Sequence, residues 1–356
     1  MKAAVLRRRG ELVVQEVSVP QPNDDEVLIR VKACGVCGSD IRYFRGDNPW
    51  SMQTLGEVHE NPSNMVLGHE LSGIVEACPS GHPTLQEGDR VSVLAYKGCG
   101  VCKYCRSDRE NLCAQTEHLG HGAGWDDRAF CPGGMAEYCT AWSDKVFALP
   151  DSVSFEEAVF LDGVAVALHA FNRGSMRQGD RVVIVGCGPI GLVLLQIAKL
   201  SGASSVICVD VQSKPLELAA LLGADKTVQV EPGALAESFR DAGVDEADVI
   251  FDSVGEASDL EPILSLLARG GTLVWLVVKD QRLAINHRLL AGERTLTVSA
   301  NNRYEFFPQA VDLVAQKRVV VKPMITHRFA LADINEGFAV MAEKERYDAL
   351  KVVIFP

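Results

Sequence analysis

The chain has 356 residues, 47% of them hydrophobic and 23% charged, and its formal net charge is -12. At roughly 150 residues per domain, this length predicts two domains, each with its own core. The acidic balance excludes a general affinity for nucleic acid or for an anionic membrane surface, and it leaves neutral or cationic small molecules as expected ligands.

The first part of the chain predicts β-structure. Alternating apolar and polar residues, as in 26–32, indicate short strands up to residue 33. Residues 34–150 are rich in glycine, cysteine and proline and contain short apolar runs at 71–77 and 90–94. We therefore expect strands joined by long loops that carry functional residues.

Between about residues 151 and 300, apolar strands alternate with helical stretches, which is the pattern of a parallel sheet in an α/β fold. The expected strands are 181–185, 205–209, 249–252 and 272–277, and the expected helices are 191–201, 215–222 and 262–268. The remaining sequence predicts a helix at 308–317 and a strand at 350–355.

No apolar run approaches the roughly 20 residues that cross a bilayer. The first ten residues have no apolar segment or cleavage site of a secretion signal. We therefore expect a cytoplasmic protein. Reducing compartments keep thiols free, so the eleven cysteines favour metal binding or catalysis over disulfides.

A glycine-rich turn follows the strand 181–185 directly and opens a helix. Its sequence assigns cofactor binding to Gly186, Gly188, Pro189, Ile190 and Gly191. The first glycine permits the tight turn, the second admits a pyrophosphate, and the third lets helix and strand pack closely. The alternative is a glycine-rich turn in some other α/β protein.

An acidic residue is expected about 20 residues after such a turn, where it binds the ribose hydroxyls. Asp210 stands there, at the end of the second strand. Its charge repels a 2′-phosphate and no arginine follows directly, so we predict NAD rather than NADP. Lys214 is either a solvated helix charge or a further contact to the ribose.

Four cysteines lie close together in the glycine-rich region. Thiolates at such short separations suit a closed, tetrahedral structural zinc site, whose binding energy holds a loop with little core. The alternatives are an iron–sulfur cluster or four unrelated thiols. The predicted ligands are Cys99, Cys102, Cys105 and Cys113.

Two further segments supply mixed metal ligands. Cys37 lies in the loop Cys-Gly-Val-Cys-Gly-Ser-Asp, and His69 and Glu70 lie in Gly-His-Glu. A thiolate, an imidazole and a carboxylate from separate loops suit a catalytic zinc that keeps one open position.

Together these motifs resemble the zinc-dependent medium-chain dehydrogenases of the alcohol dehydrogenase superfamily. Within it, Asn301-Asn302 and residues 325–329 look most like the sorbitol and threonine dehydrogenase branch. The resemblance implies a GroES-like β domain formed by residues 1–152 and 299–356 and a Rossmann NAD-binding domain at 153–298. It also implies NAD and two zinc ions per chain, one catalytic and one structural.

The resemblance assigns roles to five residues of the mixed site. Cys37 and His69 are expected zinc ligands, and Glu70 is a ligand or a close exchange partner. Ser39 is expected to bond the substrate hydroxyl and begin the proton path. Asp40 is expected to hold the His69 imidazole, or else to cap the loop.

The sequence departs from the family pattern at two positions. Asp162 stands where relatives carry a further ligand, so it is expected to bind the catalytic zinc directly or through water, or else to act as a helix N-cap. Arg42 replaces a histidine of the usual proton relay and stays protonated, although it could bind an anion. Val254 is expected to border the nicotinamide.

The remaining histidines have no partner at ligand spacing, and a solvated or core role is predicted for each. They include His82, His118, His121, His169, His287 and His327.

The resemblance implies oxidation of a secondary alcohol to a ketone with hydride transfer to NAD, and the substrate is a polyol, a sugar-like molecule or an amino-alcohol such as an aminocyclitol. The alternatives are a zinc-free quinone or enoyl reductase and a non-catalytic protein that binds zinc and NAD. A homodimer or homotetramer, formed by sheet extension around residues 295–300, is expected.

Overall fold

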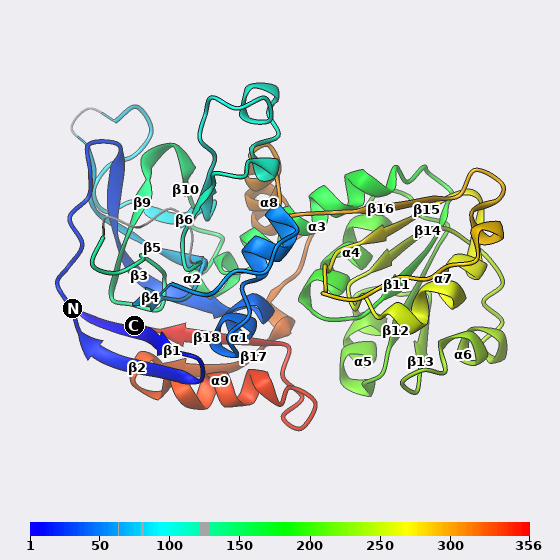
Figure 1. Cartoon of the computed structure of the whole chain (residues 1–356). Coiled ribbons are helices and arrows are strands. Elements are labelled where there is room, and N and C mark those ends of the chain that lie inside the picture. Colours follow the sequence, from blue (N-terminus) through cyan, green and yellow to red (C-terminus); the bar gives the residue numbers. More distant parts are fainter. Residues whose placement is uncertain (63, 80–81, 122–127) are drawn as a thin grey trace. The chain divides into compact units, whose positions relative to one another are not determined.

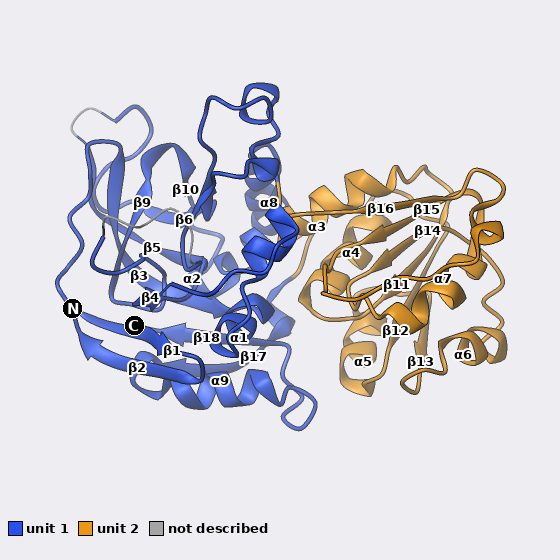
Figure 2. Ribbon diagram, in the orientation of Figure 1, with its two compact units in different colours: residues 1–162, 303–316, 321–356 blue, residues 163–302, 317–320 orange. Residues whose placement is uncertain are grey.

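The computed structural model covers residues 1–356, and the structure describes all of them except 63, 80–81 and 122–127 (Figure 1). The chain forms two compact units (Figure 2). Unit 1 comprises Met1–Asp162, Arg303–Gln316 and Val321–Pro356, and unit 2 comprises Gly163–Asn302 and Lys317–Val320. In the described part of the chain, every helix is too short or too polar to cross a membrane.

Unit 1 is built around a mixed sheet with the strand order β10-β6-β5-β3-β18-β17, and β9 also pairs with β3. A smaller sheet has the order β2-β1-β4, and β7 pairs with β8. The strands are β1 (Lys2–Arg8), β2 (Glu11–Glu16), β3 (Glu26–Val36), β4 (Met65–Val66), β5 (Glu70–Ala77), β6 (Arg90–Val93), β7 (Tyr96–Lys97), β8 (Glu117–His118), β9 (Tyr138–Trp142), β10 (Val146–Ala148), β17 (Ile325–Ala330) and β18 (Lys351–Phe355).

Segments from both ends of the chain meet in the core of unit 1. The strand β18 pairs antiparallel with β3, so that Val352 lies opposite Val36 and Ile354 lies opposite Cys34. All four side chains are buried. The helices of unit 1 are α1 (Gly38–Phe44), α2 (Phe155–Ala158), α8 (Phe306–Ala315) and α9 (Ile334–Ala342).

Unit 2 is a parallel sheet with the strand order β13-β12-β11-β14-β15-β16, which confirms the predicted α/β class. The chain moves outward from β11 in one direction and then restarts at β14 on its other side. The strands are β11 (Arg181–Val185), β12 (Ser205–Asp210), β13 (Lys226–Gln229), β14 (Ala247–Asp252), β15 (Leu267–Trp275) and β16 (Thr295–Val298), and the helices are α4 (Pro189–Leu200), α5 (Ser213–Leu221), α6 (Leu235–Asp241) and α7 (Leu260–Leu266). Helix α3 (Leu161–Gly174) begins at the end of unit 1 and continues in unit 2.

Short turns of 3-10 or π-helix connect these elements. The π turn is Ser51–Leu55, and the 3-10 turns are Cys105–Ser107, Glu110–Leu112, Ser143–Lys145, Ala257–Asp259, His287–Leu290, Lys322–Met324 and Leu331–Asp333.

One predicted boundary is wrong. The helix expected at 262–268 ends at Leu266, and Leu267 already pairs with Ala247 as part of β15. Gly270 and Gly271 lie inside this strand at an irregular point of the register. Pairing with β14 continues on both sides of them.

Candidate active site

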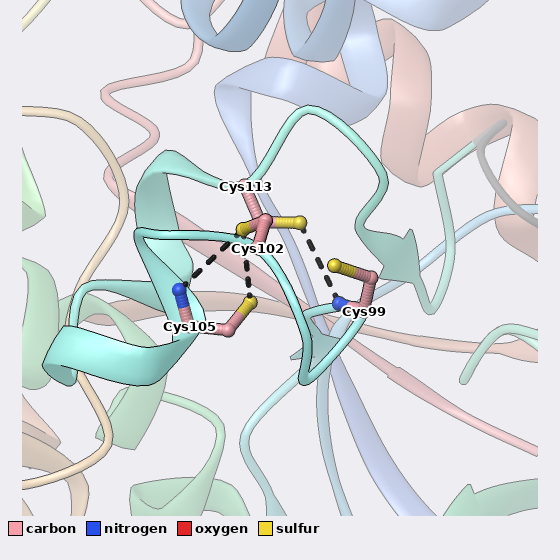
Figure 3. A group of neighbouring side chains, drawn as sticks. All are labelled: Cys99, Cys102, Cys105 and Cys113. Atoms are coloured by element: carbon pink, nitrogen blue, oxygen red, sulfur yellow. Dashed lines mark hydrogen bonds between the residues drawn. The ribbon is translucent and has the colours of Figure 1, made fainter.

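The four predicted zinc-lobe cysteines come together in unit 1 (Figure 3). We call residues 99–113 the cysteine lobe. The sulfur atoms of Cys99, Cys102, Cys105 and Cys113 all lie within 4.8 Å of one another. Backbone amides point at them: Cys99 N donates to Cys113 Sγ at 3.5 Å, and Cys105 N donates to Cys102 Sγ at 3.5 Å.

The lobe already favours thiolate in part of this set. The backbone amide of Cys105, together with further hydrogen bonds, lowers the pKa of Cys102 to about 6, whereas burial raises the pKa of Cys105 to about 12. Four neighbouring thiolates repel one another, and a tetrahedral divalent cation removes that cost. The donor set therefore fits a structural zinc ion.

The lobe is tied to unit 1 by polar side chains. The buried Lys145 ammonium pairs with Glu110, whose other carboxylate oxygen accepts from Gly98 N at 3.3 Å. The Arg303 guanidinium donates to the Asp108 carbonyl at 3.1 Å. These bonds position a segment that has few apolar contacts of its own.

A second group of ligand atoms combines residues from two strand ends of unit 1. We call Cys37, His69 and Glu70 the mixed site. One ligand atom of each lies within 4.8 Å of the other two. Cys37 is the N-cap residue of α1, directly after β3, and His69 and Glu70 stand where β5 begins. Pairing of Gly35 with Glu70 between β3 and β5 brings these segments together.

Glu70 is held by a buried cation that the sequence reasoning missed. The Lys351 ammonium on β18 lies 2.5 Å from Glu70 Oε2, and each side chain is only 5% exposed. Gly35 makes room for this arrangement, because a Cβ atom there would lie 2.4 Å from the same oxygen. The sequence signal for this role was the charge of Lys351 within an otherwise apolar predicted strand.

The mixed site has an excess of negative groups around His69. Burial lowers the pKa of His69, but the Cys37 thiolate and the Asp40 and Asp162 carboxylates outweigh it and raise the pKa to about 10. His69 Nδ1 is a buried atom without a hydrogen-bond partner among the described residues. A site that draws a proton onto imidazole this strongly suits a divalent cation in its place, so the donors fit a zinc ion.

Asp40 combines features of both expected roles. Its Oδ1 lies 3.8 Å from His69 Nδ1, too far for a hydrogen bond. Its oxygens accept from Cys37 N at 2.8 Å and Gly68 N at 3.2 Å. Asp40 therefore fixes the two loops that carry the ligands, and its charge faces the imidazole.

The glycine-rich turn lies where β11 ends and α4 begins, at the point where the order of the sheet reverses. Gly186 has a φ of +91°, and a Cβ on Gly191 would lie 1.9 Å from the Gly186 carbonyl oxygen. The space beside Gly188, the N-cap of α4, is open, and Pro189 and Ile190 begin the helix. The turn therefore has the shape that admits a pyrophosphate at a helix N-terminus.

Asp210 ends β12 beside this turn. Its Oδ2 accepts from Cys187 N at 2.7 Å, and its Oδ1 accepts from Gln212 N at 2.9 Å. The carboxylate thus braces the turn from within. Because each carboxylate oxygen can accept a further bond, it can still bind ribose hydroxyls.

Two family models match the chain: the alcohol dehydrogenase GroES-like domain at residues 23–151 and the zinc-binding dehydrogenase domain at residues 189–316. The sorbitol dehydrogenase of Bacillus subtilis is 30% identical over 363 residues, which cover 100% of this chain and 97% of that protein. The chain belongs to the zinc-dependent medium-chain dehydrogenases. This confirms the predicted family, and the relative supports the predicted branch.

Solved structures agree with this family. A short chain alcohol dehydrogenase of Escherichia coli, complexed with NADH, superposes with a TM-score of 0.87 at 25% identity and covers 100% of this chain and 99% of that one. A zinc-binding dehydrogenase of Sinorhizobium meliloti, bound to NADP, gives a TM-score of 0.86 at 28% identity, with 100% and 99% covered. As a medium-chain dehydrogenase, the protein is an oxidoreductase with a GroES-like and a Rossmann domain.

Asp162 is the further residue expected to bind the catalytic zinc. It lies in the first turn of α3, inside the helix rather than at its N-cap. It stands outside the group formed by Cys37, His69 and Glu70 among the described residues, but its charge contributes to raising the pKa of His69. Asp162 is therefore near enough to act on the mixed site electrostatically.

Among the described residues, Arg42 contacts Asp47 and Met52. Its guanidinium is 3.6 Å from the Asp47 carboxylate and also contacts Met52 Sδ at 3.8 Å. In unit 2, Lys214 forms an exposed ion pair with Glu217 at 3.0 Å. Val254 is 38% exposed beside Asp252, whose Oδ1 accepts from Val254 N at 2.8 Å.

His118 and His121 are buried, as a core role requires, but their rings lie against that of His69 in the mixed site. His169 on α3 is buried as well. The His121 ring centroid lies 4.4 Å from that of His69 and 4.1 Å from that of His118. His121 Nε2 is 3.5 Å from Ser39 Oγ. Burial holds the pKa of His121 well below its usual range and lowers that of His118 to about 3. His118 lies on β8 and His121 lies in the loop that follows it, and no spacing in the sequence marks their approach to His69.

Proposed function

We propose that this protein oxidises a secondary hydroxyl group of a polyol, a sugar-like molecule or an amino-alcohol to a ketone, with hydride transfer to NAD. The observation that carries the proposal is the convergence of Cys37, His69 and Glu70, with their ligand atoms within 4.8 Å of one another. Mixed sulfur, nitrogen and oxygen donors are typical of catalytic rather than structural zinc.

The residues of the mixed site would hold the catalytic zinc, with Asp162 as a further ligand that acts directly or through water. When bound, zinc acts as a Lewis acid that lowers the pKa of an alcohol. Ser39 stands on α1 two residues after Cys37, and its hydroxyl can bond and orient the substrate hydroxyl. Asp40 keeps the Cys37 and Gly68 loops in place while this occurs.

NAD is favoured by the turn of unit 2. The pyrophosphate would lie at Gly188 and the N-terminus of α4, and the ribose would bond Asp210. A carboxylate in this position repels a 2′-phosphate, and Val254 would border the nicotinamide.

The test is NADH formation, followed by absorbance, with polyols, sugars, amino-alcohols and simple secondary alcohols, and with NADP in parallel. We expect turnover with NAD on one hydroxylated class. Turnover with NADP alone would contradict the role of Asp210. No turnover by protein that holds a single zinc ion would favour a zinc-free reductase or a non-catalytic protein.

Metal analysis tests the ligand sets separately. We expect two zinc ions per chain, one in the cysteine lobe and one in the mixed site. The variant Asp162→Ala is expected to lose zinc from the mixed site alone. Full occupancy of both sites in this variant would exclude Asp162 as a ligand.

We further propose that the protein is a cytoplasmic homodimer or homotetramer. β16 is an edge strand of the parallel sheet, and Val298 on it is 44% exposed. Extension of the sheet through a two-fold axis at β16 would cover this edge. Sedimentation of the wild type and of Val298→Pro, which removes an outward-facing backbone donor of this strand, tests the interface.

A further inference from the structure

A buried hydrogen-bond partner faces the serine of the mixed site. His121 Nε2 lies 3.5 Å from Ser39 Oγ, and His121 is only 7% exposed. Hydrogen bonds among active-site side chains are often long before substrate binds and then shorten. Arg42, at the usual relay position, lies against Asp47 instead.

The other ring nitrogen fixes the direction of this bond. His121 Nδ1 is buried and has no hydrogen-bond partner among the described residues. A buried N–H without an acceptor is rarer in proteins than a buried acceptor without a donor. The neutral imidazole therefore carries its hydrogen on Nε2, the nitrogen that faces Ser39.

We propose that His121 is a positioning residue of this enzyme, whose Nε2–H donates a hydrogen bond to Ser39 Oγ. This bond occupies one of the two acceptor positions of the serine oxygen, and it leaves the other position and the serine proton directed at the substrate hydroxyl. This inference rests on the proposed dehydrogenase function for its kinetic consequence, whereas the hydrogen bond itself does not depend on turnover.

The surrounding rings hold the imidazole in this orientation. His118 stacks on it with an interplanar angle of 18°, and Tyr43 lies against it with ring centroids 4.9 Å apart. His118 is itself fixed, since its Nδ1 lies 3.2 Å from the Leu119 carbonyl and Tyr96 stacks on it. A ring clamped by neighbours on both sides presents its nitrogen at a constant angle, as orientation of a reacting group requires.

The direct test is the tautomer of His121 in wild-type protein labelled with 15N-histidine. Long-range proton–nitrogen correlation spectra of the wild type and of His121→Phe assign its signal. We expect hydrogen on Nε2. Hydrogen on Nδ1 would overturn the inference, whether or not the protein turns over any alcohol.

The kinetic test uses two amides that replace one ring nitrogen each. Glutamine places its amide near the Nε2 position and asparagine places its amide near the Nδ1 position. His121→Phe and His121→Asn are expected to lower kcat about 10- to 100-fold with little change in KM, as for a misplaced reacting group. His121→Gln is expected to retain most of kcat.

A double-mutant cycle separates positioning from a structural role. If His121 acts through Ser39, His121→Phe should cost little further activity in a Ser39→Ala background. Independent effects, or rescue by asparagine and not by glutamine, would overturn the inference. His169→Phe, a buried histidine of α3 in unit 2, is the matched control and should keep zinc content, melting temperature and kcat.

Discussion

The cysteine lobe and the mixed site are assembled by opposite routes within one unit. The four cysteines of the lobe lie within 14 residues of one another, and all except the buried Cys113 are partly exposed. The mixed site joins Cys37 to His69 and Glu70 through strand pairing, and Glu70 meets Lys351 from 281 residues further along the chain. We expect the lobe to depend on metal for its shape, whereas the sheet places the residues of the mixed site.

This difference sets what the neighbours of each site can do. The sulfur atoms of the lobe accept hydrogen bonds from backbone amides, and these bonds favour the thiolate form. Charged and polar side chains from several elements surround the mixed site, so single substitutions there can change reactivity without removing a ligand.

The largest expected effect follows loss of metal from the lobe. The double variant Cys102→Ser/Cys105→Ser should lose one zinc ion per chain and show the largest fall in melting temperature, because structural zinc sites contribute about 10 kcal/mol or more. Zinc analysis and thermal unfolding measure this. Cys78→Ser, outside both sites, is the control, and an unchanged melting temperature of the double variant would show that the lobe folds without metal.

The mixed site should respond instead to its buried ion pair. Lys351→Met leaves Glu70 buried without its cation, which is expected to cost about 3–5 kcal/mol in urea unfolding of zinc-free protein. Adding Glu70→Gln should recover much of the loss, since the uncompensated charge is removed. Equal stability of wild type and Lys351→Met would show that the pair does not matter.

The same pair has a defined pH dependence. Burial lowers the pKa of Lys351, but attraction by Glu70 and Cys37 outweighs it and raises the pKa above 10.5. A raised pKa stabilises the fold below 10.5, and this contribution is lost as pH rises through the folded pKa. The stability gap between wild type and Lys351→Met should therefore narrow in strong alkali.

The glycine-rich turn, like the cysteine lobe, is formed by residues that are close together in the sequence. Its acidic partner, Asp210, is brought to it by the fold. Asp210→Asn removes a charge that braces Cys187 N and faces the ribose, so kcat/KM for NAD should fall about 10- to 100-fold, as for a lost hydrogen bond to a charged group. The preference for NAD over NADP should weaken as well. Asp225→Asn, which removes a carboxylate paired with Lys199, is the control; an unchanged preference would contradict the assignment.

An exposed ion pair of unit 1 should give the smallest effect. Arg328 pairs with Glu156 at 2.8 Å with both side chains partly exposed, so Arg328→Gln should cost at most about 1 kcal/mol. The Arg328 hydrogen bond lowers the pKa of Glu156 below 4.5, so this stability exists above 4.5 and is lost as pH falls. A loss of unfolding free energy near that of Lys351→Met would show that burial does not distinguish the two ion pairs.

The locally encoded features could be predicted from the sequence. The cysteine spacing indicated the lobe, and the alternation of strands and helices indicated the parallel sheet with its glycine-rich turn. Strand β11 has the predicted bounds, whereas α7 ends early because β15 already pairs with β14 at Leu267.

The environment of the mixed site could not be predicted in the same way. Lys351 becomes a partner of Glu70 only because β18 pairs with β3, and no pattern near either residue specifies that pairing. His118 on β8 and His121 in the following loop lie beside His69, where Tyr96 and Tyr43 pack against them. The family resemblance supplied the ligands together with Ser39, Asp40 and Asp162, but not Lys351, His118 or His121.

The interior position of β18 has a consequence for synthesis. This strand separates β3 from β17 in the finished sheet, so the ribosome must add 281 residues after Glu70 before Lys351 can neutralise it. Unit 2, largely one continuous segment, can fold while β3 still awaits its neighbour. A chain released before β18 would expose two strand edges and an uncompensated carboxylate, which are features that favour aggregation. Exposure of these features beside Glu70 therefore distinguishes a truncated chain from one that contains β18.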